Sequence, residues 1–210
     1  MTVLAIAPIS VSFGVDIQQP IEEALLGIMP FHDWQVRLFL EKVTVQSFRK
    51  NECLLSPPKV CRWAAIVLKG SFRMFRKTEE KEHTLHFFTE KDWIGDLESF
   101  VSQQPSQNYI QAMEKSEVGL ITIHALHELM AVDQMFMGLG RMMKGWTITT
   151  NQYTSLIDDN PDARYQALLK DHPEWILRFP QMHLAAYLGM SRETFSRVKR
   201  RNAALRAGIQ

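Results

Sequence analysis

The fold of this chain is decided near its C-terminus, by the stretch Gln181-Met-His-Leu-Ala-Ala-Tyr-Leu-Gly-Met-Ser-Arg-Glu-Thr-Phe-Ser-Arg-Val-Lys-Arg200. Two helical patterns meet there at Gly189, a residue that can take the positive φ of a tight turn. Ser191 follows with a hydroxyl suited to accept a hydrogen bond at a helix N-terminus, so a second helix is predicted from Arg192. Small or apolar residues stand where two crossing helices must bury each other: Leu184, Ala185, Leu188, Met190, Phe195 and Val198.

The second of these helices is predicted to have one buried and one polar face. At about 100° per residue from Arg192, Phe195 and Val198 fall near ~300° and ~240°. The polar residues all fall between 0° and about 140°, and they are Arg192, Glu193, Ser196, Arg197 and Arg200. Arginine can donate two hydrogen bonds to guanine, and glutamate can accept one from cytosine N4, so this face can read base edges. An ordinary helical hairpin with a charged, solvated face is the alternative.

Positive charge is concentrated in the same region. The 210 residues carry a net charge of +1, yet residues 181–210 hold six basic side chains and one acidic side chain. That segment is therefore about +5, and the rest of the chain is about −4. A nucleic acid would be attracted to the C-terminal region and to little else. A solvated basic tail would give the same charge pattern.

Composition argues for a soluble cytoplasmic protein. The longest apolar run, Trp63–Leu68, is far shorter than the ~20 residues that cross a bilayer. The first residues lack the basic flank and apolar core of an export signal. With no such signal and only Cys53 and Cys61, a reducing compartment with free thiols is predicted.

Residues 43–123 change to a pattern of short strands. Gly70 predicts a tight turn between two of them, and the charged stretch Lys77–Glu82 predicts a hairpin loop. An amphipathic stretch, Ile21–Leu40, precedes the strands, with breaks near Gly27 and Pro30 and with Asp33 as a helix N-cap. Many short strands favour an antiparallel barrel or roll. The predicted strands are Val43–Phe48, Glu52–Leu55, Ala64–Leu68, Ser71–Arg76, Thr84–Phe88, Tyr109–Ala112 and Val118–Ile123.

From residue 126 an apolar residue recurs every seven positions in two rows. One row is Leu129, Phe136, Met143, Thr150 and Ile157, and the other is Val132, Leu139, Trp146 and Tyr153. Such a seam predicts a long helix over 126–158 that packs on the same helix of a second copy, making a homodimer. Charged substitutions at Leu139 and Trp146 are then expected to give monomers. Pro161 is a suitable first residue for the next helix.

The predicted fold class is α+β. A poorly ordered leader occupies residues 1–18, an antiparallel β-roll residues 19–125, a long dimerisation helix residues 126–158, and a helical region with a helix-turn-helix residues 159–210.

From about residue 20 the chain resembles the Crp/Fnr superfamily of bacterial transcription regulators. The segment Met190-Ser-Arg-Glu-Thr-Phe-Ser-Arg197 is very similar to the recognition-helix signature of the catabolite activator branch. The resemblance implies that Arg192, Glu193 and Arg197 read bases in half-sites like TGTGA. It implies double-stranded DNA and RNA polymerase as partners. Ser196 and Arg200 of the polar face, together with Arg201, complete the predicted DNA-binding residues. Arg164-Tyr165 at the start of the region resembles members common in Bacteroidetes. The wing hairpin that usually follows is predicted to be reduced or absent, since Asn202–Gln210 remain.

The sensor half resembles the family's cyclic-nucleotide-binding β-roll less closely. In those sensors a Gly-Glu turn binds the ribose, and an Arg-Ser/Thr-Ala segment binds the phosphate. Here Gly95-Asp96 stands at the turn and Ser106-Gln107-Asn108 over the phosphate motif, and Pro57-Pro58 replaces a usual glycine. Without the arginine, a buried phosphate loses its main partner, so cyclic AMP is not expected to bind and the effector is unknown. The predicted ligand pocket is Gly95, Asp96, Leu97, Ser106, Gln107 and Asn108.

Other chemistries are not supported by the sequence. Two cysteines are too few for an iron–sulfur cluster held by four. His83 and His86 are predicted on opposite faces of a strand, and His124 and His127 lack an evident third ligand, so no metal site is expected. No nucleophile–base pair is evident, so no enzyme is predicted. A scaffold or ligand-binding protein that has lost DNA binding, and a cupin-like enzyme, are the competing hypotheses.

Overall fold

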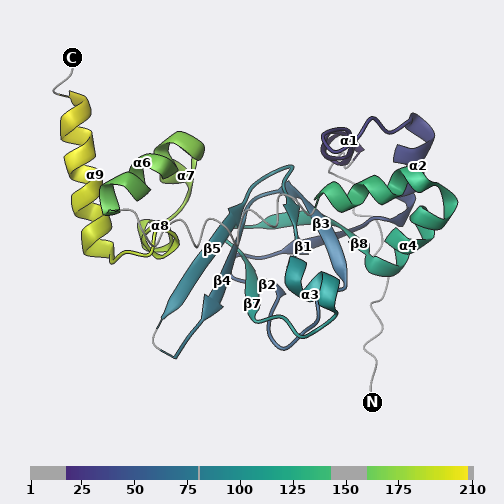
Figure 1. The fold of residues 1–210 in the computed structure, drawn as a ribbon, viewed down its shortest axis with the longest axis horizontal. Helices are drawn as coiled ribbons and strands as arrows, with labels where there is room; N and C mark the ends of the chain where they lie inside the picture. Colours follow the sequence, from purple (N-terminus) through teal and green to yellow (C-terminus); the bar gives the residue numbers. More distant parts are fainter. Residues whose placement is uncertain (1–17, 80, 143–159, 208–210) are drawn as a thin grey trace.

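The computed structural model describes residues 18–79, 81–142 and 160–207. A roll of two antiparallel sheets forms its centre, as Figure 1 shows. One sheet has the order β1-β8-β3-β6 and the other the order β2-β7-β4-β5. The strands are β1 (Thr44–Phe48), β2 (Cys53–Leu55), β3 (Trp63–Lys69), β4 (Phe72–Lys77), β5 (Glu82–Phe88), β6 (Trp93–Ile94), β7 (Asn108–Ala112) and β8 (Ser116–Thr122).

The predicted strands are confirmed within one or two residues at each end, and the structure adds β6, which the sequence analysis missed. β6 is two residues long and pairs with β3 through Ile94 and Trp93, too short to produce an alternating pattern. The predicted turn at Gly70 is also confirmed. Its φ is +83°, and a Cβ there would lie 2.8 Å from the carbonyl oxygen of Lys115, so glycine is required.

Two helices precede the roll, α1 (Gln18–Leu26) and α2 (Asp33–Lys42), with the predicted break between them. The predicted N-cap is wrong by one residue. His32 is the capping position and Asp33 is the first helical residue. The backbone N–H of His32 donates to the Gln35 side-chain oxygen at 2.8 Å. A residue of the first helical turn thus provides the hydrogen-bond partner for the N–H of the capping residue.

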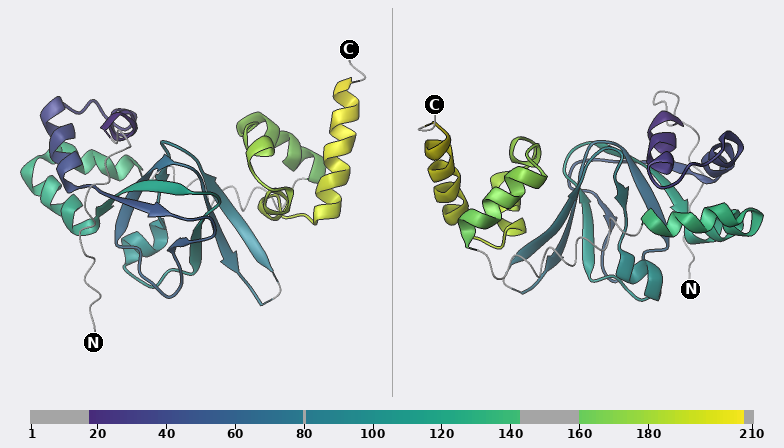
Figure 2. Two further views of the ribbon diagram at one scale, coloured as in Figure 1. Left: turned by 180° about the vertical axis from the view of Figure 1, so that it is seen from behind. Right: turned by 45° about the horizontal axis from the view of Figure 1, so that its top comes forward.

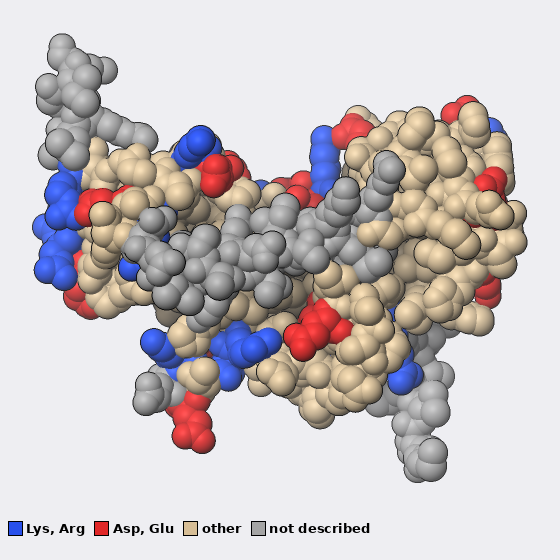
Figure 3. All heavy atoms as spheres, in the orientation of Figure 1, with Lys and Arg blue, Asp and Glu red and all other residues tan. Residues whose placement is uncertain are grey.

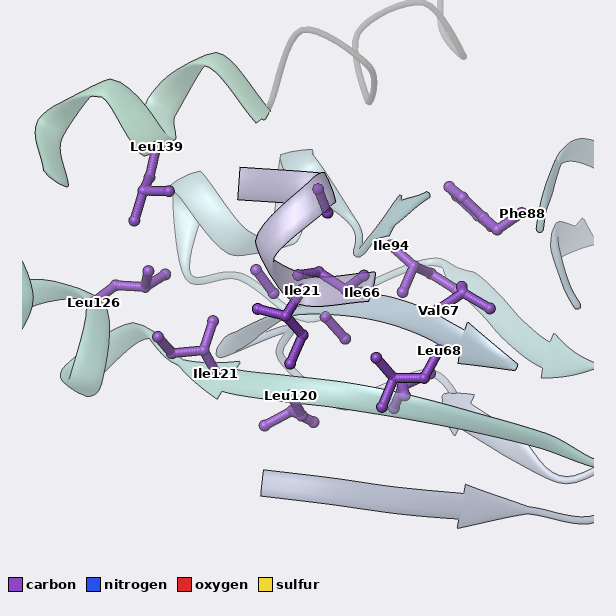
Figure 4. Packing of buried hydrophobic residues seen from close by; sticks show 14 of the residues in the cluster. Ile21, Ile66, Val67, Leu68, Phe88, Ile94, Leu120, Ile121, Leu126 and Leu139 are labelled. Atoms are coloured by element: carbon purple, nitrogen blue, oxygen red, sulfur yellow. The ribbon is translucent and has the colours of Figure 1, made fainter. Parts of the chain in front are cut away.

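The main core fills the roll and extends to these helices. Residues Ala64–Leu68 of β3 are buried on both faces, because β3 is central in its sheet and helices cover it. Phe39 of α2 is fully buried there, with its ring edge-on to Trp93 at 6.2 Å. Figure 4 shows this packing, with Ile21 and Ile66 close to one another.

The continuous helix predicted from residue 126 is corrected by the structure. Helix α4 (Ile123–Val132) ends before Asp133, and a 3-10 helix, η1 (Gln134–Met142), follows. The Asp133 carboxylate accepts from the Met135 N–H at 2.7 Å and from the Gln35 amide at 3.2 Å, so it begins a new element. Residues 143–158 of the predicted helix lie outside the described residues.

Three of the described residues of the heptad seam pack within the chain, while Val132 is 63% exposed. Leu129, Phe136 and Leu139 are all fully buried in the main core, and Phe136 stacks on Phe31 at 5.6 Å. In Figure 4 the Leu139 side chain extends from its helix toward the sheet. A charge at Leu139 is therefore expected to disrupt the core rather than to separate two protomers. An apolar repeat has the same spacing whether its partner is a second copy or a sheet.

Four helices form the C-terminal region: α6 (Pro161–Asp171), α7 (Trp175–Arg178), α8 (Gln181–Tyr187) and α9 (Arg192–Ala207). The predicted start at Pro161 is confirmed, with the Asn160 side chain capping α6. The views in Figures 1 and 2 place this region beside β4 and β5, at the end of the roll opposite to α1, α2 and α4. It has a core of its own, to which β5 contributes Phe87.

Candidate nucleic-acid interface

The turn between α8 and α9 has the geometry that the sequence predicts. Gly189 takes a φ of +61°, and the Met190 N–H donates to the Ala185 carbonyl at 3.0 Å. Ser191 accepts from the Thr194 N–H at 3.1 Å, which caps α9. Arg164, from α6, donates to the Leu188 carbonyl at 2.7 Å and so holds the turn from outside. The sequence carries no signal for that contact, because the two residues are distant along the chain.

The inner face of α9 is buried as predicted. Phe195 and Val198 are 0% and 2% exposed. The Phe195 ring lies edge-on to Tyr165 of α6, with ring centres 5.6 Å apart. One turn further, Asn202 is buried and donates to the Val198 carbonyl at 2.9 Å and to the Asp162 carboxylate at 3.2 Å. These contacts fix α9 in orientation on α6.

The outer face of α9 carries the predicted polar residues. Arg192, Glu193, Arg197 and Arg200 are exposed, and Ser196 is half-buried. Figure 3 shows basic side chains along the outer edge of the molecule, over α9. A backbone N–H at the start of α9 and the Ser191 hydroxyl lower the pKa of Glu193, so its carboxylate is charged and can accept hydrogen bonds.

Arg201 differs from the other predicted DNA-binding residues. It lies against α6, where its guanidinium forms an ion pair with Asp162, with Nε 3.0 Å from one carboxylate oxygen. The structure thus brings Arg192, Glu193, Arg197 and Arg200 to one exposed face and directs Arg201 toward an acidic partner. On the helix it is about 180° from Arg192.

The predicted ligand-pocket residues meet around a buried carboxylate. Asp96 is 3% exposed and accepts from the Ser106 hydroxyl at 2.5 Å and from the Asn108 amide at 3.1 Å. It also caps α3 (Leu97–Ser102) by accepting from the Ser99 N–H at 3.4 Å. Gly95 is buried, Leu97 is half-buried, and Gln107 is exposed. The polar groups are therefore satisfied within the chain.

The hydrogen bonds of Asp96 leave it few free acceptor sites. The Asp96 carboxylate already accepts three hydrogen bonds, so little acceptor capacity remains for a ribose hydroxyl. A phosphate near Ser106 would approach the same buried negative charge. The nearby Arg76 uses its Nε to donate to the Asn108 side-chain oxygen at 3.1 Å. In the residues that the structure describes, this site is a closed polar cluster.

Phe87 of β5 connects the roll to the helical region. Its ring stacks on Phe179 with centres 4.2 Å apart and planes at 14°, and it meets Trp175 edge-on at 5.1 Å. On the polar side, Arg178 donates to both oxygens of Glu90, at 2.6 and 2.8 Å, and to Glu114 at 3.0 Å. The sequence did not predict this interface. Phe87 and Phe88 are adjacent and both apolar, so nothing in the sequence distinguishes the ring that faces the helices from the ring that faces the roll.

His86 also lies at this interface, beside Trp175 at 5.4 Å and Phe88 at 4.8 Å. Burial, with a smaller effect of His172, lowers its pKa to about 4, so the imidazole is neutral. Its Nδ1 has no hydrogen-bond partner among the described residues. No group of three potential metal ligands occurs in the described ranges, and no helix there is long and apolar enough to cross a membrane.

Comparison with known proteins agrees with this architecture. Residues 45–133 match the family model of the cyclic nucleotide-binding domain. No curated protein sequence matches the chain significantly. Among solved structures, the c-di-GMP-responsive global regulator CLP of Xanthomonas campestris is 17% identical, with a TM-score of 0.66 over 82% of this chain and 92% of that one.

Two further structures extend the comparison. FixK2 of Bradyrhizobium japonicum is 17% identical, with a TM-score of 0.69 over 78% of this chain and 85% of that one. The catabolite activator protein of Thermus thermophilus is 20% identical, with a TM-score of 0.53 over 84% and 86% of the two chains. At these identities the likeness concerns the fold. Residues 45–133 are therefore similar to a cyclic nucleotide-binding domain, and a further structure of the same fold, 16% identical with a TM-score of 0.61, is described as a putative transcriptional regulator of the crp/fnr family from Eubacterium rectale.

Proposed function

We propose that the protein is a sequence-specific DNA-binding transcription regulator of the Crp/Fnr type. The observation that carries the proposal is the outer face of α9, where Arg192, Glu193 and Arg197 are exposed on a helix whose opposite face is buried. The turn at Gly189 and the cap at Ser191 support the interpretation of α8 and α9 as a helix-turn-helix. In that role α9 enters the major groove with its N-terminal turns first.

The partners follow from that role. Two copies of the chain would bind a palindromic site, since a two-fold protein requires two-fold DNA. RNA polymerase is the further partner that transcription regulation implies, and the cytoplasm is the expected location. Arg164-Tyr165 supports a place among the members typical of Bacteroidetes. We assign no enzymatic activity to the protein. We also propose that the wing is reduced or absent, because helix α9 extends to Ala207.

Selection from random double-stranded DNA tests the proposal. We expect enrichment of a palindrome with half-sites like TGTGA, whose centres lie about one helical turn apart. Enrichment of an unrelated motif would contradict the reading roles of Arg192, Glu193 and Arg197. No enrichment would favour the alternative, a scaffold protein of the same fold that has lost DNA binding.

Cyclic AMP is not expected to be the effector. The cluster of Asp96, Ser106 and Asn108 is closed by its own hydrogen bonds, and a phosphate would meet the buried carboxylate. Calorimetric titration with cyclic AMP is expected to give no dissociation constant below ~10 μM, which corresponds to about −7 kcal/mol. A titration with cyclic di-GMP, the ligand named for the Xanthomonas neighbour, is a parallel test with more phosphate charge. Tight binding of either would contradict the closed site.

A further inference from the structure

A buried arginine joins the β-roll to α8, the first helix of the turn. Arg73 lies on β4 with its side chain 3% exposed. Its Nη1 lies 2.5 Å from Nδ1 of His183 on α8, and its Nη2 donates to the Glu82 carboxylate at 2.7 Å. The guanidinium also lies 4.0 Å from the centre of the Phe75 ring. We call Arg73, Glu82 and His183 the Arg73 cluster.

The contact with His183 fixes the protonation of that histidine. Because a guanidinium only donates, Nδ1 of His183 must accept, and the ring is then neutral with its proton on Nε2. The groups that face this ring are Arg73 and Glu82. Burial and then Arg73 lower the pKa of His183 to about 4, against a smaller opposing effect of Glu82. The neutral ring therefore persists at physiological pH.

Stability alone does not account for this cluster. Removing a cation from water is costly, and apolar residues of similar volume often replace a buried ion pair without loss. Arg73 also leaves its Nε without a partner among the described residues. The cluster instead fixes the relative positions of the groups that it joins, because hydrogen bonds to a planar guanidinium are directional.

The Arg73 cluster fixes the position of α8. Because α9 packs on α8, it also fixes the position of α9. The Phe87 contacts are apolar and permit sliding, whereas the Arg73 cluster and the pair between Arg178 and Glu90 are separate directional contacts. Two directional contacts on one packed surface also resist rotation. Since α8 and α9 pack together, the exposed face of α9 then has one orientation relative to the roll.

We infer that Arg73 is a positioning residue for α9, which orients the DNA-reading face relative to the roll. The inference rests on the proposed function, because its consequence is measured on DNA. Arg73 itself is buried and touches no phosphate. Its removal should therefore change affinity without changing which sequence is chosen.

The test compares Arg73→Met with Arg62→Met, which removes an exposed charge elsewhere on the roll. On the DNA site selected by the wild type, Arg73→Met is expected to bind about tenfold more weakly, because fewer molecules hold α9 in the competent orientation. The enriched motif and the dependence of affinity on salt should not change, whereas loss of a phosphate contact would reduce the salt slope by about 1. Arg62→Met should bind as the wild type does.

A direct readout of the contact is the imidazole of His183, followed by NMR between pH 5 and 8. In Arg73→Met the neighbouring cation is gone, so His183 should begin to titrate at higher pH than in the wild type. Arg73→Lys keeps the positive charge but lacks the planar set of donors of a guanidinium. It should therefore restore the wild-type titration of His183 in part, and the affinity for DNA to a smaller extent. Hydrogen exchange in α8 should be faster in Arg73→Met.

The outcomes separate the two proposals. If the wild type selects no DNA sequence, the proposed function fails, while the His183 titration still reports on the contact. If the wild type selects DNA and Arg73→Met binds it equally well, the positioning role is wrong. A changed motif or a smaller salt slope in Arg73→Met would also overturn it, because either would make Arg73 a DNA contact.

Discussion

Replacing Phe87 with alanine is expected to lower the free energy of unfolding by about 3–5 kcal/mol, the usual cost of deleting a buried ring. Phe87 is fully buried, and it is a β-roll residue in a core otherwise made by the helical region. Besides the area lost, each aromatic pair contributes ~0.5–1.5 kcal/mol. The ring stacks on Phe179 and meets Trp175 and Tyr187.

Urea denaturation with hydrogen exchange checks this expectation. The wild type should unfold with its roll and helical region together, because Phe87 belongs to both. In Phe87→Ala the helical region should exchange at lower urea concentration than the roll. Phe88→Ala is the matched control, since Phe88 packs in the main core and its loss should weaken the roll itself. A loss of less than ~1 kcal/mol in Phe87→Ala would mean that the interface is not formed.

The pair Phe87–Phe88 also marks the limit of what the sequence could predict. Short apolar runs between turn residues identified most strands, because buried side chains are concentrated in those runs and the turns between them are polar. On β5, Phe88 is buried in the core of the roll and Phe87 in the core of the helical region, and no pattern in the sequence distinguishes the two. The repeat at Leu129, Phe136 and Leu139 failed in the opposite way, since a regular apolar spacing gave no indication of which partner it met.

The residues of the candidate site also fall into those that local sequence predicts and those that only the fold brings together. The outer face of α9 was predictable, because Phe195 and Val198 fix the helix rotation and local spacing then places Arg192 and Arg197. Contacts between distant residues were not. Arg73 stands between Phe72 and Met74 in a strand, and only the fold brings it to His183. The hydrogen bond between Asp96 and Ser106 likewise depends on the fold of the chain between them.

The largest effect on DNA binding is expected from the arginines of α9. Replacing Arg192 or Arg197 with alanine should cost roughly 1–3 kcal/mol at a guanine of the selected site, because a bidentate contact is lost. Glu193→Ala should instead relax the choice at one base pair, since its charged carboxylate is the acceptor for a cytosine amine. Fluorescence anisotropy on the selected site and on sites with single base changes measures both effects.

Two arginines further along α9 provide the contrast. Arg200 is exposed, so Arg200→Ala should weaken binding to all sequences alike and reduce the salt slope by about 1, as for a phosphate contact. Arg201 is paired with Asp162 on α6, so Arg201→Ala should change the salt slope less than Arg200→Ala. If Arg201→Ala instead costs as much as Arg192→Ala and alters one base preference, the helix docks with a different face toward the bases. The expected loss of binding on alanine substitution is therefore largest at Arg192 and Arg197, smaller at Arg200 and smallest at Arg201. Measuring this order tests the rotation of α9 in the major groove directly.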